Sequence, residues 1–386
     1  MIYFIYFILF LTPTYLLRFN IFYIPTNALE LMIIILFLIW IVKKLLLGNL
    51  FYNLKTEIIN NKLLYIGIFL LFIGFILSLV KSNDVLSSLG IIKSWFVVPL
   101  LFYIVLKNVL KNEIEKKKAF FVFIFSGFAI SAIGLIYFIL DILTYDNRLQ
   151  AFYPHPNMLS IIMAVSVIMI IGLRFEIRKL NIIKYSVFVL FLFSLVFNLI
   201  TTKSSGAHIG AILAIYFMDF KNFIFNKKYA NYILFGIIIF AGLVLPFASK
   251  LTNPWEMERN SIASRLMVWQ SSVEIIKDNF ILGIGPADFQ NKYLEYQENF
   301  NPYLEWAVPH SHNIFISTWL MSGFIGFIGF ILILFSIFKK IPNNKSQISS
   351  VIALTILIYL LVHGFVDNTI WKNDLSIIFW FLIALI

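Results

Sequence analysis

Twelve mainly apolar segments determine what this chain can fold into. A helix needs about 20 apolar residues to cross the hydrocarbon core of a bilayer. Of the 386 residues, 61% are hydrophobic and 13% are charged, against roughly half and about a quarter in soluble domains. We therefore predict an all-α, polytopic integral membrane protein of about twelve transmembrane helices. The predicted spans are 2–17, 28–42, 63–80, 91–107, 119–140, 158–173, 183–200, 206–219, 231–249, 313–338, 348–366 and 374–386.

No internal repeat and no Gly/Ser-rich linker divides the chain, so 1–386 is expected to form a single transmembrane domain. The absence of cysteine excludes a disulfide framework, a thiolate nucleophile and a cysteine-bound metal. The N-terminus has no basic region and no small-residue cleavage site. We therefore interpret 2–17 as a retained span and not as a signal peptide.

The positions of lysine and arginine predict the orientation, because cytoplasmic connections are enriched in both. With a cytoplasmic N-terminus, five connections lie inside, and with the flanking helix ends they carry nineteen Lys and Arg against five acids. The net charge of +11 is then explained by topology, and nucleic-acid binding is unnecessary. Arg18, which follows the first span, is a local exception. Both termini are predicted to be cytoplasmic. The five inner connections are 43–62, 108–118, 174–182, 220–230 and 339–347.

One outer connection, 250–312, between the ninth and tenth spans, is far longer than the others. A loop of that length without a function of its own is uncommon. Apolar residues at intervals of three and four predict an amphipathic helix over 260–280. We expect this helix to lie in the membrane interface with Leu266 and Trp269 toward lipid. Its apolar residues are Leu266, Trp269, Val273 and Ile276.

Arg148, Arg259 and Arg265 all fall at the predicted outer face. Arginine there can bind phosphate through two parallel hydrogen bonds, or its side chain can simply extend to lipid headgroups. Both interpretations stay open for Arg259 and Arg265. Arg148 favours a functional role, because the Pro-His-Pro-Asn turn at 154–157 fixes the local backbone.

All five histidines also fall at the outer face, which random placement would seldom produce. A histidine can accept a proton from a hydroxyl near neutral pH. We assign that role to His312, at the membrane boundary. His310 is expected to be solvated at the start of the tenth span, where Asn313 bonds the first free amides. His155 and His363 are interpreted as structural, and His208 has no assigned role.

Metal binding has little support in the sequence. There is no HExxH motif, no Asp-x-Asp motif and no histidine pair at i, i+4 near a carboxylate. The first outer connection, 18–27, contains no acid, whereas metal-dependent lipid-linked sugar transferases generally use acids there. We therefore expect no metal and no other cofactor. The glycines of "GFIGFIG" (323–329) are interpreted as a helix-packing motif.

An ordered set of motifs resembles the O-antigen ligase/polymerase family of bacterial envelope enzymes. The motifs cover roughly 146–326, and the layout of spans extends the similarity to most of the chain. In one departure, Lys203 precedes Ser204-Ser205 where family members often carry an arginine after the serine. The matching residues are Arg148, Pro156-Asn157, Ser204-Ser205-Gly206, Arg265 with Trp269, Gly283 with Gly285, His312-Asn313, and Gly323 with Gly326.

The resemblance implies a metal-independent, inverting glycosyltransferase. It would transfer a glycan from undecaprenyl pyrophosphate to a hydroxyl of lipid A–core at the outer face of the bacterial cytoplasmic membrane. By this resemblance His312 would be the base, and Arg148 and Arg265 would hold the pyrophosphate and neutralise its growing charge. The residues expected to bind substrate are Asn157, Lys203, Ser205, Trp269, His310 and Asn313.

Three alternatives remain open from the sequence. An O-antigen or capsule polymerase of the same family differs only in its acceptor. A secondary transporter would place charged residues or broken helices near mid-bilayer, and no predicted span carries a charge at its centre. A non-catalytic envelope scaffold is the third alternative.

Overall fold

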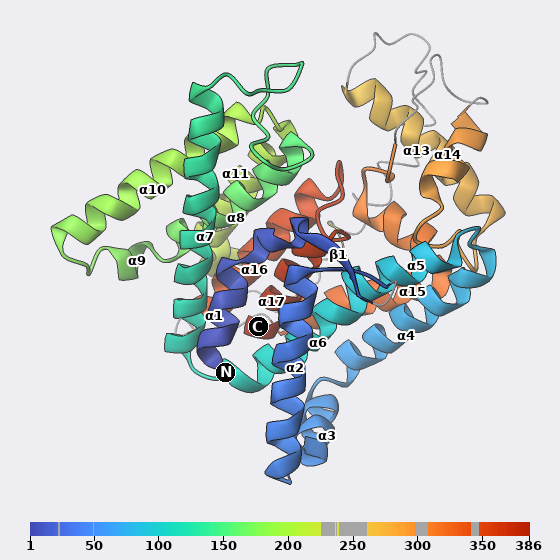
Figure 1. Ribbon diagram of the computed structural model, residues 1–386, viewed down its shortest axis with the longest axis horizontal. Coiled ribbons are helices and arrows are strands. Elements are labelled where there is room, and N and C mark those ends of the chain that lie inside the picture. The colour runs from blue at the N-terminus through green and yellow to red at the C-terminus, as the bar shows by residue number, and fades with distance from the viewer. Residues whose placement is uncertain are drawn as a thin grey trace.

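The chain forms a bundle of helices joined by short connections (Figure 1). The structure is a computed structural model that describes residues 1–21, 24–48, 50–224, 236, 238, 261–297, 308–340 and 347–386. Most of the predicted span 231–249, Arg259 and much of the predicted loop 250–312 lie outside these residues.

Five helical segments of the described chain are long and apolar enough to cross a membrane. They agree closely in position with predicted spans, and four shorter apolar helices match further spans. The long segments are 62–81, which contains α4 (Lys62–Ser78), 85–109, which contains α5 (Val85–Ile92) and α6 (Val98–Val109), α7 (Glu113–Ile139), α10 (Ile182–Thr201) and α15 (Ile314–Lys339). The shorter helices are α8 (Pro156–Gly172), α11 (Ser205–Ile224), α16 (Ile348–His363) and α17 (Asn373–Leu385).

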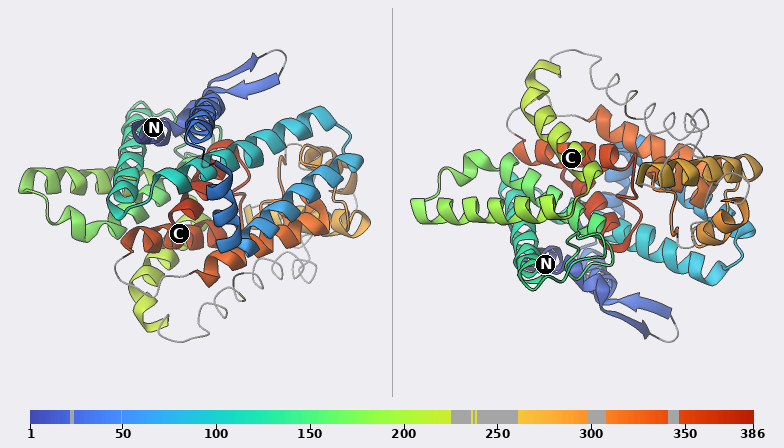
Figure 2. Two further views of the ribbon diagram at one scale, coloured as in Figure 1. Left: turned by 90° about the horizontal axis from the view of Figure 1, so that it is seen from below. Right: turned by 90° about the horizontal axis from the view of Figure 1, so that it is seen from above.

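Of the remaining elements, α1 and α2 pack within the bundle against α7 and α6, and the others lie at its ends and sides. Figure 1 shows α13 and α14 at the upper end and α3 at the lower end, and Figure 2 shows the two-stranded hairpin projecting sideways. In the hairpin, Arg18 pairs with Asn27 and Ile21 with Ile24. These elements are α1 (Ile2–Phe10), β1 (Arg18–Ile21), β2 (Ile24–Asn27), α2 (Ala28–Leu46), α3 (Leu50–Asn60), α9 (Arg174–Ile177), α13 (Ser261–Asp278) and α14 (Phe289–Gln297).

The prediction of a single helical span over 2–17 is wrong. Helix α1 has nine residues, and a 3-10 turn at Thr12–Leu16 follows it with Pro13 near its start. Nine residues of α-helix extend about 14 Å, less than half of the ~30 Å hydrocarbon core. Proline has no backbone N–H and cannot continue the ladder of helical hydrogen bonds.

Side-chain caps explain where several helices begin. Asn27 accepts a hydrogen bond from the amide of Glu30 at the start of α2. At the start of α7, Asn112 and Glu115 form a reciprocal capping box. The Asn313 side chain accepts from two amides at the start of α15, as the sequence predicted. Such caps satisfy amides that have no partner within the helix.

A break in α15 joins this helix to the segment that follows α13. Gly323 has φ +64° and ψ −174°, so the helix is interrupted there. Two backbone hydrogen bonds cross the break: the amide of Ile284 donates to Leu320 O over 2.8 Å, and that of Phe324 donates to Ile281 O over 3.1 Å. Because Gly283 also has a positive φ and lies against Leu320 O, two glycines allow the backbones to meet.

The other two glycines of 323–329 have the packing role predicted for them. Helix α15 lies along α4 (Figure 2), and Gly326 and Gly329 face Gly74 and Gly67. A Cβ added at Gly67 would lie 2.8 Å from the carbonyl oxygen of Gly329. Small residues let two membrane helices approach closely, which increases their van der Waals contact.

Gly323→Ala should strongly destabilise the protein. Its new Cβ would overlap the carbonyl oxygen of Ile281, in a backbone conformation that L-residues adopt at a cost of about 1–2 kcal/mol. We expect the free energy of unfolding to fall by about 3 kcal/mol or more, since overpacking adds to the backbone strain. Thermal unfolding of the purified protein in detergent measures this.

The control is Gly48→Ala, because Gly48 has the same φ of +64° and nothing within 4 Å of an added Cβ. Gly48→Ala should lower the free energy of unfolding only by the backbone cost of about 1–2 kcal/mol. Equal losses for the two variants would show that the contact between Gly323 and Ile281 does not matter.

Candidate functional site

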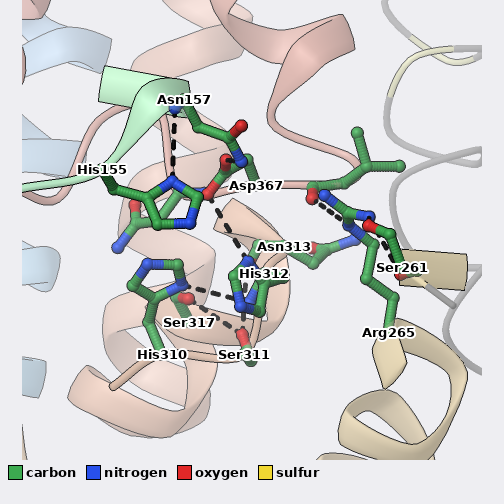
Figure 3. Close-up of polar contacts among 12 residues, drawn as sticks. His155, Asn157, Ser261, Arg265, His310, Ser311, His312, Asn313, Ser317 and Asp367 are labelled. Atoms are coloured by element: carbon green, nitrogen blue, oxygen red, sulfur yellow. Dashed lines mark hydrogen bonds and ion pairs between the residues drawn. The ribbon is translucent and has the colours of Figure 1, made fainter. Parts of the chain in front are cut away.

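The site is built where α8 and α15 begin and where 364–372 links α16 to α17. His155 caps α8, and Asn313 caps α15 and donates to Phe365 O over 3.1 Å. These contacts bring three separate segments to one place around Asp367 (Figure 3). Helix N-termini carry partial positive charge, so an anion is favoured here.

Asp367 is the buried centre of this arrangement, with only 2% of its surface exposed. Its Oδ2 accepts from Asn157 Nδ2 over 2.6 Å, and its Oδ1 accepts from the amide of Asn368 over 2.7 Å. His312 Nδ1 lies 3.6 Å from Oδ1. Burial alone would raise the pKa of Asp367, but His312 together with Lys372 and His310 outweighs it and holds the pKa well below its usual range. Asp367 is therefore a carboxylate at neutral pH.

Arg148 joins Asp367 through a bridging amide. Its Nη2 donates to Asn157 Oδ1 over 2.6 Å, and its Nε donates to the carbonyl oxygen of Thr202 over 2.7 Å. Asp146 lies at 3.7 Å from Nη1. The Asn157 side chain thus bridges the two charges, because its Oδ1 accepts from Arg148 and its Nδ2 donates to Asp367.

Arg265, on the first turns of α13, reaches the same loop from the other side (Figure 3). Its Nε donates to the carbonyl oxygen of Val366 over 2.8 Å, next to Asp367. Its Nη1 donates to Ser261, and its Nη2 has no partner among the described residues. Burial lowers the pKa of Arg265, Asp367 opposes that change, and the charge of Arg148 adds to it. The two arginines therefore act on one electrostatic centre.

His312 is held by its backbone as well as by Asp367. It has φ +50°, a conformation uncommon outside glycine, and its amide donates to His310 Nδ1 over 3.4 Å. The two imidazoles lie 4.4 Å apart between centroids. His310 is half-buried, so the prediction that it is solvated is wrong. Burial lowers the pKa of His310 well below its ordinary value, and the neighbouring His312 lowers it further.

Trp269 is oriented differently from our expectation. It is 6% exposed, and its Nε1 donates to the carbonyl oxygen of Ser311 over 3.1 Å. It does not dip toward lipid but supports the 308–313 segment from α13. The periodicity that predicted an apolar face was correct, because Val273 and Ile276 are buried too. That face packs against protein, since the segment after α13 docks on α15.

The structure gathers some of the predicted site residues and leaves others apart. Arg148, Asn157, Arg265 and His312 surround Asp367, with His310 and Asn313 directly beside them. Lys203 and Ser205 are exposed, and neither side chain has a hydrogen bond to these residues within the described part of the chain. Their segment still contributes through Thr202, whose carbonyl accepts from Arg148.

The other three histidines have backbone or local partners. His208 Nε2 lies 2.9 Å from the carbonyl oxygen of Leu199. His363 is buried, with its Nδ1 at 3.1 Å from the hydroxyl of Tyr359. His155 caps α8 through its Nδ1, which accepts from the amide of Asn157 over 3.2 Å. These contacts agree with the structural interpretation of His155 and His363.

One comparison with protein families found a match over part of the chain. Residues 187–331 match the family model described as O-antigen ligase. The match confirms the resemblance that the motifs indicated. The O-antigen ligase segment contains Arg265 and His312, whereas Arg148, Asn157 and Asp367 lie outside it. A comparison with curated proteins found no match.

Sequence reasoning missed Asp367, the centre of the candidate site. The residue lies between two apolar spans at their predicted outer end, and its position four residues after His363 drew no functional assignment. An acid in a short connection between two apolar spans was the available signal. Its partners His312 and Asn157 are distant in sequence, so no local motif joins them.

His310, His312 and Asp367 could also hold a divalent cation. One ligand atom from each lies within 4.8 Å of the others. Imidazole nitrogen and carboxylate oxygen are typical zinc ligands, and tetrahedral coordination would need separations of roughly 3.3 Å from bonds of about 2.0–2.1 Å. The prediction of a metal-free site relied on local spacing, which does not detect this group.

Asn157→Leu should destabilise the protein, because Arg148 and Asp367 each lose one hydrogen bond and the amide that joins them is removed. Loss of hydrogen bonds to buried charged groups predicts a cost of about 2–3 kcal/mol, measured by thermal unfolding in detergent. Ser160→Ala, one turn along α8, removes only a neutral hydrogen bond to Asn157 O and serves as the control. A cost no larger than that of Ser160→Ala would contradict the bridging role.

Proposed function

We propose that the protein transfers a glycan from undecaprenyl pyrophosphate to an acceptor hydroxyl at the outer face of the cytoplasmic membrane. The reaction is of the O-antigen ligase type, with lipid A–core as acceptor. The observation that carries this proposal is His312 placed beside the buried carboxylate of Asp367, with Arg148 and Arg265 attached to the same centre.

His312 is the general base in this mechanism. A protonated Nδ1 facing Asp367 leaves Nε2 with a lone pair for the acceptor hydroxyl. As the hydroxyl oxygen attacks the anomeric carbon, its proton passes to Nε2 and the imidazolium is stabilised by Asp367. A carboxylate that orients the base and stabilises its charged form is a recurrent arrangement in enzymes.

The arginines act on the leaving group. The bond between the anomeric carbon and the pyrophosphate oxygen breaks, and the electron pair stays on the lipid pyrophosphate. Arg148 and Arg265 supply fixed positive charge where this negative charge grows, so they stabilise the transition state more than the ground state. Attack opposite the departing oxygen inverts the anomeric configuration. No metal is required in this proposal.

A polymerase of the same family would use the same steps with a second lipid-linked glycan as acceptor. Transport is less well supported, because the buried acids lie at helix ends and loops. Glu30 is in the first turn of α2, Asp374 is in the first turn of α17, and Asp367 is between helices. A transport pathway would favour charges near mid-bilayer.

His312→Ala should lower glycan transfer by at least about 10²–10⁴-fold, the usual contribution of a well-placed base. Donor binding should persist, and His310→Ala should be much milder. The measurement is in vitro transfer from a lipid-linked donor by purified proteins, with and without EDTA. Activity of the wild type should survive EDTA. Loss of wild-type activity in EDTA, or a fully active His312→Ala protein, would contradict the proposed mechanism.

Arg265→Lys should not restore the transfer activity that Arg265→Ala loses. The guanidinium binds Val366 O and Ser261 through two different nitrogens and still offers Nη2, whereas lysine has one nitrogen. We expect intact protein with little transfer in both variants, scored against protein level and melting temperature. Near-normal activity of Arg265→Lys would reduce Arg265 to an interfacial anchor.

A further inference from the structure

A second polar site lies at the end of the bundle away from Asp367, where α3 meets α4 and α15 ends. It is a cavity of about 500 Å³. We call it the inner cavity, because the distribution of lysine predicts that this end is cytoplasmic. Its described lining residues are Ile59, Asn60, Asn61, Lys62, Leu63, Leu64, Ile66, Ser336, Lys339 and Lys340.

The charge of the inner cavity selects an anion. Lys62, Lys339 and Lys340 line it, and no acid is among its described lining residues. Lys62 is the first residue of α4, a helix of 17 residues that has no side-chain cap. Uncapped amides at a helix N-terminus and three ammonium groups favour a phosphate.

The cavity is also pre-shaped by contacts around Asn61. Lys340 donates to Asn61 Oδ1, while Asn61 Nδ2 donates to Glu57 Oε1 over 2.7 Å. These bonds tie the end of α15 to the junction of α3 and α4. Lys62 and Lys339 have no hydrogen bond or ion pair with any described residue, so their charges remain available.

The apolar part of the lining distinguishes a lipid from a free ion. Ile59 on α3 and Ile66 on α4 line the cavity and are 64% and 40% exposed. A soluble phosphate has nothing to place against them, whereas an acyl chain does. Basic pockets between membrane helices on the cytoplasmic side bind anionic lipid headgroups.

We propose that the inner cavity binds the phosphate headgroup of an anionic phospholipid of the cytoplasmic leaflet. Lys62, Lys339 and Lys340 contact the phosphate, and the acyl chain lies along Ile59 and Ile66. This proposal rests on the predicted orientation and is independent of the proposed transfer reaction.

The test measures phosphatidylglycerol bound to the purified full-length protein in neutral detergent, counted by native mass spectrometry. A lysine near a membrane surface contributes about 5-fold in affinity. Lys62→Gln with Lys339→Gln should therefore weaken binding by roughly 30-fold. Both side chains lack described partners, so the fold should be retained, and each single variant should weaken binding by about 5-fold.

The matched control removes Lys43 and Lys44, which lie in the last turn of α2 and do not line the cavity. Lys43→Gln with Lys44→Gln should leave binding unchanged. Equal losses in the two double variants would mean that general positive charge attracts the lipid, and would overturn the site. Equally tight binding of phosphatidylcholine would do the same. Displacement of phosphatidylglycerol by an equimolar amount of inorganic phosphate would assign the cavity to a free ion.

Discussion

The burial of the Asp367 carboxylate is the constraint on which the site depends. An unpaired charge in such a place would cost several kcal/mol, and here Asn157, the amide of Asn368 and His312 compensate for it. Because these partners belong to different segments, compensation is possible only when α8, the 364–372 connection and the start of α15 are all in place. The electrostatic requirement of one carboxylate therefore fixes the relative positions of two of the three catalytic candidates, His312 and Arg148.

The break at Gly323 supplies the second half of this geometry. A continuous α15 would offer no free carbonyl at Leu320 to the segment after α13, since an intact helix uses that carbonyl internally. The break frees it for Ile284, and α13 is thereby held where Arg265 reaches Val366 O. Gly323, which the sequence analysis interpreted as a packing residue, thus also fixes the amphipathic helix α13 to the bundle.

The sequence could predict local features of the structure, but it could not predict contacts between residues that are distant in sequence. Apolar length identified most spans, and an asparagine before an apolar run identified the cap of α15. Charge asymmetry placed His312, Arg148 and Arg265 on one side. The sequence could not identify Asp367, whose partners are distant in sequence, nor tell that the apolar face of α13 meets protein and not lipid. Periodicity reports that Trp269 is on an apolar face but not what covers that face.

At both ends of the molecule an asparagine joins a cation to an acid: Asn157 joins Arg148 to Asp367, and Asn61 joins Lys340 to Glu57. In the proposed transfer site Asp367 offsets part of the charge of Arg148 and Arg265, so a pyrophosphate would be held less tightly there than by two arginines without an acid. That suits a catalyst, because only charge that develops in the transition state should be stabilised fully and the product must leave. The inner cavity has no acid in its described lining. Lys62 and Lys339 have no partner among the described residues, and this favours retention of the proposed lipid.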